Sequence, residues 1–107
     1  MSWNDADESD KILYKALSSL YAHNENLLHL LLNPDCPSLM TSSDGLKLYC
    51  KALSSGEQVL LRIGLDIWDG SGGIHFNELY ETLDDKNFQK MLQVLLFLRS
   101  PKEAILF

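Results

Sequence analysis

Apolar residues recur with helical spacing in the first third of the chain. These positions are Leu13, Leu17, Leu20, Leu27 or Leu28, and Leu31. A spacing close to 3.6 residues predicts an amphipathic helix with one face toward a core. Because Asn24 falls on this apolar stripe, the pattern predicts either one kinked helix or two helices that break near residues 23–26, with Asn24 or Asn26 as the second cap. Pro34 cannot continue a helix, so the helical region is expected to end at Asn33.

The most apolar helix is predicted to follow the serine pair at residues 54–55. Ser54 or Ser55 is the expected N-cap, and Glu57 places a negative charge at the positive end of the helix dipole. Apolar side chains then cover most of the circumference: Val59, Leu60, Leu61, Ile63, Leu65, Ile67 and Trp68. Such a helix should be central and buried on most sides. Gly64 inside it costs about 1 kcal/mol relative to Ala, which predicts a close helix crossing there.

Three further helices are predicted, over residues 46–53, 77–83 and 86–99. Asn77 is the expected cap of the second, Asp84 or Asp85 is that of the third, and Pro101 ends the last helix. The side chains expected to point inward from this last helix are Phe88, Met91, Leu92, Leu95 and Leu96. The whole pattern predicts an all-α fold: a single compact helical domain of five or six helices, with at most one short strand near Ile74.

The chain has 107 residues, which suits one domain. Residues 1–8 are expected to form an acidic, frayed tail, and residues 9–107 the helical domain, with Ser9 or Asp10 as the first N-cap. The C-terminal tail ends in Ile105, Leu106 and Phe107. Because exposed apolar residues in a row are unusual, we expect this tail to dock on the helices or to belong to an interface.

The composition favours a protein partner over nucleic acid or a membrane. The net charge is −6, and the isoelectric point is about 4.8. A phosphate backbone would be repelled by this charge, whereas a basic protein surface would be attracted. The N-terminus is polar and acidic, unlike a secretory signal, and no apolar run is long enough to span a bilayer. We therefore expect a cytoplasmic protein in which Cys36 and Cys50 are free thiols rather than a disulfide.

The stretch WDGSGGIHFNEL, from Trp68 to Leu79, resembles the second half of an EF-hand calcium loop. With Gly72 at the sixth loop position, the last position falls on Glu78, as such a loop requires. The resemblance implies a divergent calcium-binding helix-loop-helix protein whose ligands would be Asp69, Ser71, Gly73 and Glu78.

The first half of this loop departs from the calcium pattern. Position 1 would be Ile67, which has no oxygen ligand, and the neighbouring Asp66 lies about 100° around the helix. His75 at position 9 is a poor ligand for a hard cation, and no second loop is found to pair with it. The simpler interpretation is a helix stop followed by a helix start, with glycines at positive φ and with Asp69 and Ser71 bonding local backbone. We therefore favour no metal and no cofactor.

The order of helix, extended segment at residues 73–76, short helix and long helix also resembles a winged-helix domain. In that arrangement the last helix would enter the DNA major groove. It offers only Lys86, Lys90 and Arg99, and the segment from Asp66 to Asp85 contains no Lys or Arg. We therefore expect at most a winged-helix-like domain without strong DNA binding.

No catalytic motif is apparent. His23, His29 and His75 form no zinc motif, neither cysteine belongs to a C-x-x-C pair, and no phosphate loop occurs. We predict a small acidic, non-enzymatic protein that acts by protein–protein interaction as a regulatory, inhibitory or accessory subunit, with a homodimer as one further state. The interaction candidates are Asp66, Asp69, Glu78, Glu81, Asp84, Asp85, Ile105, Leu106 and Phe107.

Overall fold

The computed structural model describes residues 6–40, 45–46, 48 and 51–101. These residues include five complete helices: α1 (Glu8–Leu20), α2 (Glu25–Leu31), α4 (Ser55–Asp69), α5 (Phe76–Thr82) and α6 (Asp85–Arg99). Within the same residues, β pairing is limited to one antiparallel bridge between Leu32 and Leu39. The radius of gyration of 13.2 Å is close to the roughly 13 Å of a compact domain of this size. The all-α prediction is confirmed.

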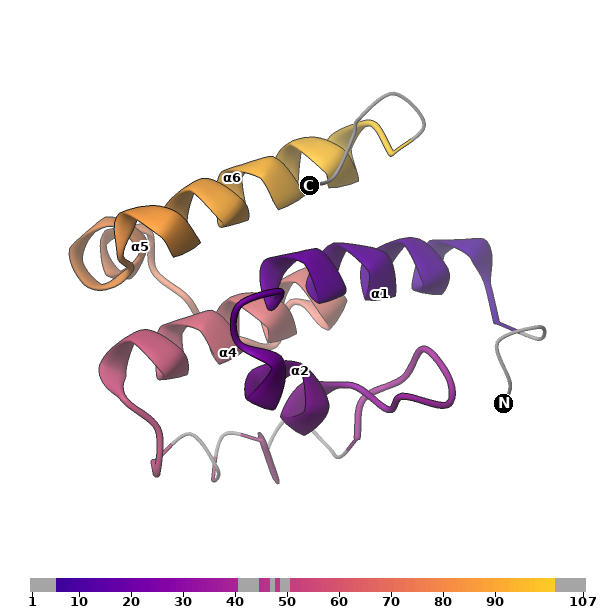
Figure 1. Cartoon of the computed structure of the whole chain (residues 1–107), viewed down its shortest axis with the longest axis horizontal. Coiled ribbons are helices and arrows are strands. Elements are labelled where there is room, and N and C mark those ends of the chain that lie inside the picture. The colour runs from indigo at the N-terminus through magenta and orange to yellow at the C-terminus, as the bar shows by residue number, and fades with distance from the viewer. Residues whose placement is uncertain (1–5, 41–44, 47, 49–50, 102–107) are drawn as a thin grey trace.

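Helices α1 and α4 form the centre of the molecule. Figure 1 shows α6 on one side of α1, with α2 on the opposite side. α1 packs against both α6 and α4, whereas α2 and α5 each pack against α4. Because α6 rests mainly on α1, the space between α6 and α4 is available for a groove near α5.

The predicted break in the first helical region is confirmed. α1 ends at Leu20 and α2 begins at Glu25, with Asn24 at its N-cap position. Two boundaries differ from the prediction. α1 begins at Glu8 after Asp7, so Ser9 and Asp10 are helical residues rather than caps. α2 ends at Leu31, earlier than predicted, because the chain then extends and Leu32 pairs with Leu39.

α4 begins and ends as its sequence predicts. The Ser54 hydroxyl accepts from Glu57 N at 3.2 Å, and Glu57 Oε1 accepts from Ser54 N at 3.2 Å, which together form a capping box. At the other end Gly70 has φ 78°, a left-handed conformation that glycine adopts without steric cost.

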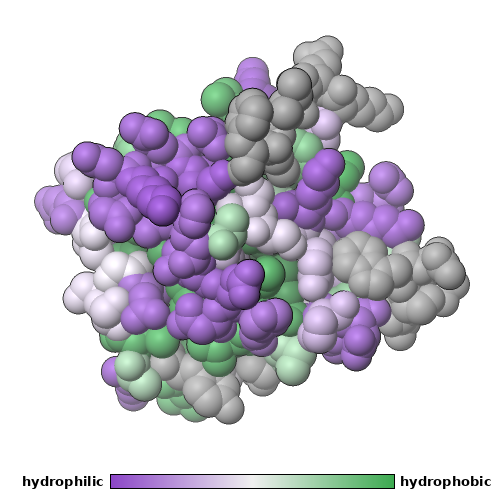
Figure 2. Space-filling model, viewed as in Figure 1, coloured by the Kyte–Doolittle hydropathy of each residue, from purple (hydrophilic) through white to green (hydrophobic). Residues whose placement is uncertain are grey.

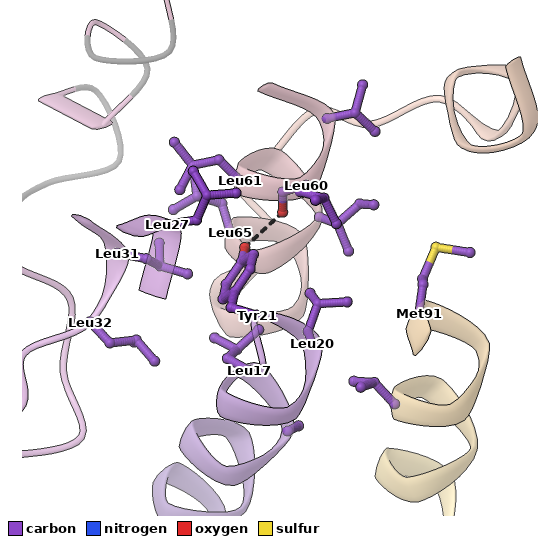
Figure 3. Close-up of a cluster of buried hydrophobic side chains, with 14 of the residues drawn as sticks. Leu17, Leu20, Tyr21, Leu27, Leu31, Leu32, Leu60, Leu61, Leu65 and Met91 are labelled. Atoms are coloured by element: carbon purple, nitrogen blue, oxygen red, sulfur yellow. Dashed lines mark hydrogen bonds between the residues drawn. The ribbon is translucent and has the colours of Figure 1, made fainter. Parts of the chain in front are cut away.

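The core lies where α1, α2 and α4 meet. In Figure 3 the Tyr21 ring stands between Leu27, Leu31 and Leu65, and its hydroxyl points at α4. This hydroxyl donates to the Leu60 carbonyl at 2.7 Å, which satisfies the only polar atom of a fully buried side chain. A Cβ on Gly64 would lie 2.0 Å from Tyr21 Oη and 2.8 Å from Leu31 Cδ2, so side chains from two neighbouring segments pack against α4 at this glycine.

The last two helices differ from the prediction in one cap and in one face. His75, and not Asn77, occupies the N-cap position of α5, whereas Asp84 caps α6 as predicted by accepting from Asn87 N at 2.8 Å. Met91, Val94 and Phe97 are the buried residues of α6. The inward placement of Leu92, Leu95 and Leu96 is wrong, because all three are exposed. α6 has a wider apolar stripe than its contact with α1 can cover.

The helix predicted over residues 46–53 is described only in part. Gly45, Leu46 and Leu48 are helical, and Lys51 and Ala52 form a turn. Tyr49 and Cys50 lie outside the described residues.

Candidate functional site

The connection between α4 and α5 is organised around the Arg62 side chain. Its guanidinium forms a bidentate ion pair with the Glu78 carboxylate, with Nη1 at 2.7 Å from Oε2 and Nη2 at 3.2 Å from Oε1. Nε also donates to the Gly72 carbonyl at 3.0 Å, and Nη2 donates to the Gly73 carbonyl. One cation on α4 therefore binds two loop carbonyls and the first turn of α5.

Asp66 lies one helical turn after Arg62 and holds the same loop through its amides. Its Oδ1 accepts from Gly72 N at 2.8 Å, and its Oδ2 accepts from Ile74 N at 3.1 Å. A Cβ on Gly72 would lie 1.9 Å from the Arg62 carbonyl oxygen, so the loop approaches the α4 backbone closely at this point. Two side chains of α4 therefore fix the loop: Arg62 binds its carbonyls, and Asp66 binds its amides.

The four residues proposed as calcium ligands make other contacts in the structure. Asp69 is exposed, and its Oδ1 accepts from Ser71 N at 3.0 Å, which is a local turn bond. Gly73 has φ 67° and gives its carbonyl to Arg62. Glu78, the residue that would supply the two-oxygen ligand, is bound to Arg62. A calcium ion at this loop would have to displace the guanidinium, which makes the contacts that a cation would make.

Glu78 also caps the helix in which it lies. Its Oε1 accepts from His75 N at 3.1 Å. This backbone hydrogen bond, together with the hydrogen bond from Arg62, lowers the pKa of the Glu78 carboxyl below its usual value. Glu78 is therefore a structural anion at neutral pH.

The other acidic candidates lie along α5 and at the start of α6. Glu81 is exposed on α5, and Asp85 is exposed in the first turn of α6. Asp84 is the α6 cap, so its carboxylate serves the helix end. Ile105, Leu106 and Phe107 lie outside the described residues.

An apolar groove opens where α4, α5 and α6 meet. It is a hollow of about 270 Å³, and Asp66 is the polar residue among the described residues that line it. The other lining residues are Ile63, Ile67, Ile74, Leu79, Met91, Leu95 and Leu98. We call this hollow the apolar groove.

An aromatic shelf adjoins the apolar groove and shares Leu79, Met91 and Leu95 with it. This second hollow, of about 380 Å³, is completed by Phe76, Tyr80, Phe88 and Leu92. Phe76 is 84% exposed and Tyr80 is 68% exposed, although large aromatic side chains are usually well buried. The face in Figure 2 is mainly hydrophilic, with smaller hydrophobic areas between. Among the described residues, five of the seven exposed large hydrophobic side chains lie on α5 and α6, so exposed apolar surface is concentrated on these two helices.

The groove and Arg62 were not identified from the sequence. Arg62 is the single cation among the fifteen residues of α4, and it shares a helix face with Asp66. That isolated charge was the feature of the sequence that could have identified Arg62. The sequence indicated the groove less clearly, because an apolar residue such as Leu95 fits a buried core position as well as a groove wall.

Comparison with known proteins gives no assignment, because no family model, curated protein or solved structure matches the chain. Among the described residues, no three His, Cys, Asp or Glu side chains gather as metal ligands. The same part of the chain contains no helix of the length and apolarity needed to cross a membrane. Cys36 is a free thiol that lies 3.1 Å from the Ser38 hydroxyl.

Proposed function

We propose that this protein acts by binding another protein, as a regulatory, inhibitory or accessory subunit, and that the apolar groove with its aromatic shelf is the binding surface. The observation that carries the proposal is the exposure of Phe76 and Tyr80 beside Leu92 and Leu95. Buried aromatic anchors supply much of the binding energy at protein interfaces. In this proposal the protein works by binding and not by catalysis.

The occupant we propose is an amphipathic helix of the partner. A groove walled by helices accepts the apolar face of another helix, whose side chains at every third or fourth position enter it. Asp66 lies in the groove, and Glu81, Asp84 and Asp85 lie on or beside the helices that bound it. This acidic surround favours a partner helix with basic residues flanking its apolar face.

A displayed library of helical peptides tests this proposal. Peptides are selected on the purified protein, and the best binder is titrated by calorimetry against the wild type and the Phe76→Glu and Leu95→Glu variants. Met40→Glu is the matched control, because Met40 is similarly exposed (52%) and does not line the groove. We expect micromolar binding by peptides rich in Leu and Lys or Arg, weakened about ten-fold or more by each groove variant and unchanged by the control.

NMR chemical-shift mapping of the complex provides an independent check. Amide NMR shifts caused by the peptide should concentrate at Leu79, Met91 and Leu95. Failure to enrich any helical peptide, or equal affinity for all variants, would contradict the proposal.

A further inference from the structure

The solvent side of α6 carries a second exposed apolar surface, which shares Leu92 with the aromatic shelf and adds Leu96. Leu96 is 66% exposed, and Leu92 is 45% exposed. At about 100° per residue, Leu96 lies about 40° from Leu92 around the helix, on the side away from the buried Val94. We call this surface the α6 ridge, formed by Leu92 and Leu96 with Asp85 and Arg99 at its two ends.

The charges of the α6 ridge are placed symmetrically about Leu92. Asp85 precedes it by seven residues and Arg99 follows it by seven, so each lies roughly 10 Å away along the axis and about 20° around it. Both charged side chains are exposed. The other cations of this helix, Lys86 and Lys90, lie about 120° or more around the helix from Leu92 and about 80° or more from Leu96. The ridge therefore has a negative end, an apolar middle and a positive end.

We infer that the α6 ridge docks on the same ridge of a second copy, in antiparallel orientation about a two-fold axis near Leu92. This orientation brings Asp85 of each copy to Arg99 of the other, so that one contact is made twice. The drift of about 20° per seven residues matches helices that cross at about 20°. Parallel pairing would instead oppose like charges at both ends, which is unfavourable.

The dimer is expected to be weak because the ridge is narrow. A stable interface buries roughly 800 Å² on each partner. Two leucines supply only a small part of that area, and neighbouring side chains such as Leu95 and Gln89 add to it. We therefore expect a dissociation constant in the micromolar range or weaker.

Analytical ultracentrifugation of the full chain over a wide concentration range tests this inference. The wild type should pass from monomer to dimer as concentration rises. Asp85→Arg or Arg99→Asp alone should weaken the dimer roughly ten-fold, since each substitution opposes like charges at both ends of the interface. The double variant Asp85→Arg with Arg99→Asp should recover most of the wild-type affinity. Lys86→Glu, a charge reversal at another exposed residue that is not part of the ridge, should leave the affinity unchanged.

Leu96→Glu gives a second test that does not depend on charge pairing, and it should abolish the dimer while circular dichroism shows the helices intact. A monomer at all concentrations, a dimer insensitive to these variants, or a double variant without recovery would each overturn the inference. Because the α6 ridge shares Leu92 with the aromatic shelf, the Leu96→Glu variant is the one that separates this inference from the proposed function. Leu96 does not line the groove, so a monomer that still binds helical peptides would overturn the self-docking alone.

Discussion

Substitution of Gly72 by Ala tests the contact that joins the α4–α5 loop to α4. The added Cβ would lie 1.9 Å from the Arg62 carbonyl oxygen and 2.9 Å from Asp66 Cγ. Both neighbours belong to helix α4, and the first is backbone, so the loop must move away. That movement disrupts the hydrogen bonds of Gly72 to the Arg62 and Asp66 side chains, at 3.0 Å and 2.8 Å.

The free energy of unfolding should fall by about 2–4 kcal/mol. A hydrogen bond to a charged group contributes about 1.5–3 kcal/mol, and the partial exposure of these groups reduces the sum of the two. For a domain of this size each kcal/mol lowers the melting temperature by roughly 4–8 °C. Urea unfolding followed by Trp fluorescence measures the change, since Trp68 lies near the loop on α4.

Gly56→Ala is the matched control for this substitution. A Cβ at Gly56 meets no atom within 4 Å, and the residue lies in the first turn of α4. This variant should be neutral or up to about 1 kcal/mol more stable, because Ala favours the helix. A loss below about 1 kcal/mol for Gly72→Ala, or equal losses for both variants, would refute the close approach of the loop to α4.

Three further predictions concern other contacts. Gly64→Ala should destabilise the fold by about 1–3 kcal/mol through its clash with the Tyr21 hydroxyl, and by less in a Tyr21→Phe background, as a double-mutant cycle of urea unfolding would show. Ser54→Ala should cost about 1 kcal/mol in the same assay, because it removes the acceptor of the α4 capping box. The pKa values of Glu78 and Glu57 are lowered in the fold, chiefly by backbone hydrogen bonds. The stability that these two carboxylates add is therefore present above the unfolded pKa near 4.5, and it is lost as the pH falls through the folded pKa values. Glu78→Gln should flatten this acid-side loss in urea midpoints measured between about pH 7 and pH 3.

Each of these predictions has a contradicting result. An unchanged penalty for Gly64→Ala in the Tyr21→Phe background would show that the hydroxyl is not the obstacle. Full stability of Ser54→Ala would show that the cap contributes nothing. An acid limb of the same slope with and without Glu78 would show that its pKa is not lowered on folding.

Local signals in the sequence predicted most element boundaries correctly. Ser54 and Asp84 are caps because a short polar side chain before an apolar run accepts a hydrogen bond from the free amides of the first turn. Gly70 ends α4 because it adopts a positive φ without steric cost. These effects act over a few residues, so a sequence pattern contains them.

The predicted cap of α5 was wrong because this boundary depends on a contact between residues that are far apart in the sequence. Asn77 is a good cap in isolation, yet Glu78 reaches back to the His75 amide and starts the helix earlier. Its carboxylate is held in place by Arg62, which lies sixteen residues before it. A contact across that distance does not appear in a local pattern.

The sequence by itself determined the helical fold class, the central position of α4 and the need for space at Gly64, because periodicity and glycine placement are properties of neighbouring residues. Only the tertiary structure decided which side of each apolar helix is covered. Leu92 and Val94 are both apolar, so a sequence pattern does not separate them, but Val94 is buried in the fold and Leu92 is exposed. Tertiary packing likewise placed the Arg62 guanidinium at the loop that resembles a calcium site. Burial depends on which elements meet in space, and that is settled by the packing of the whole chain.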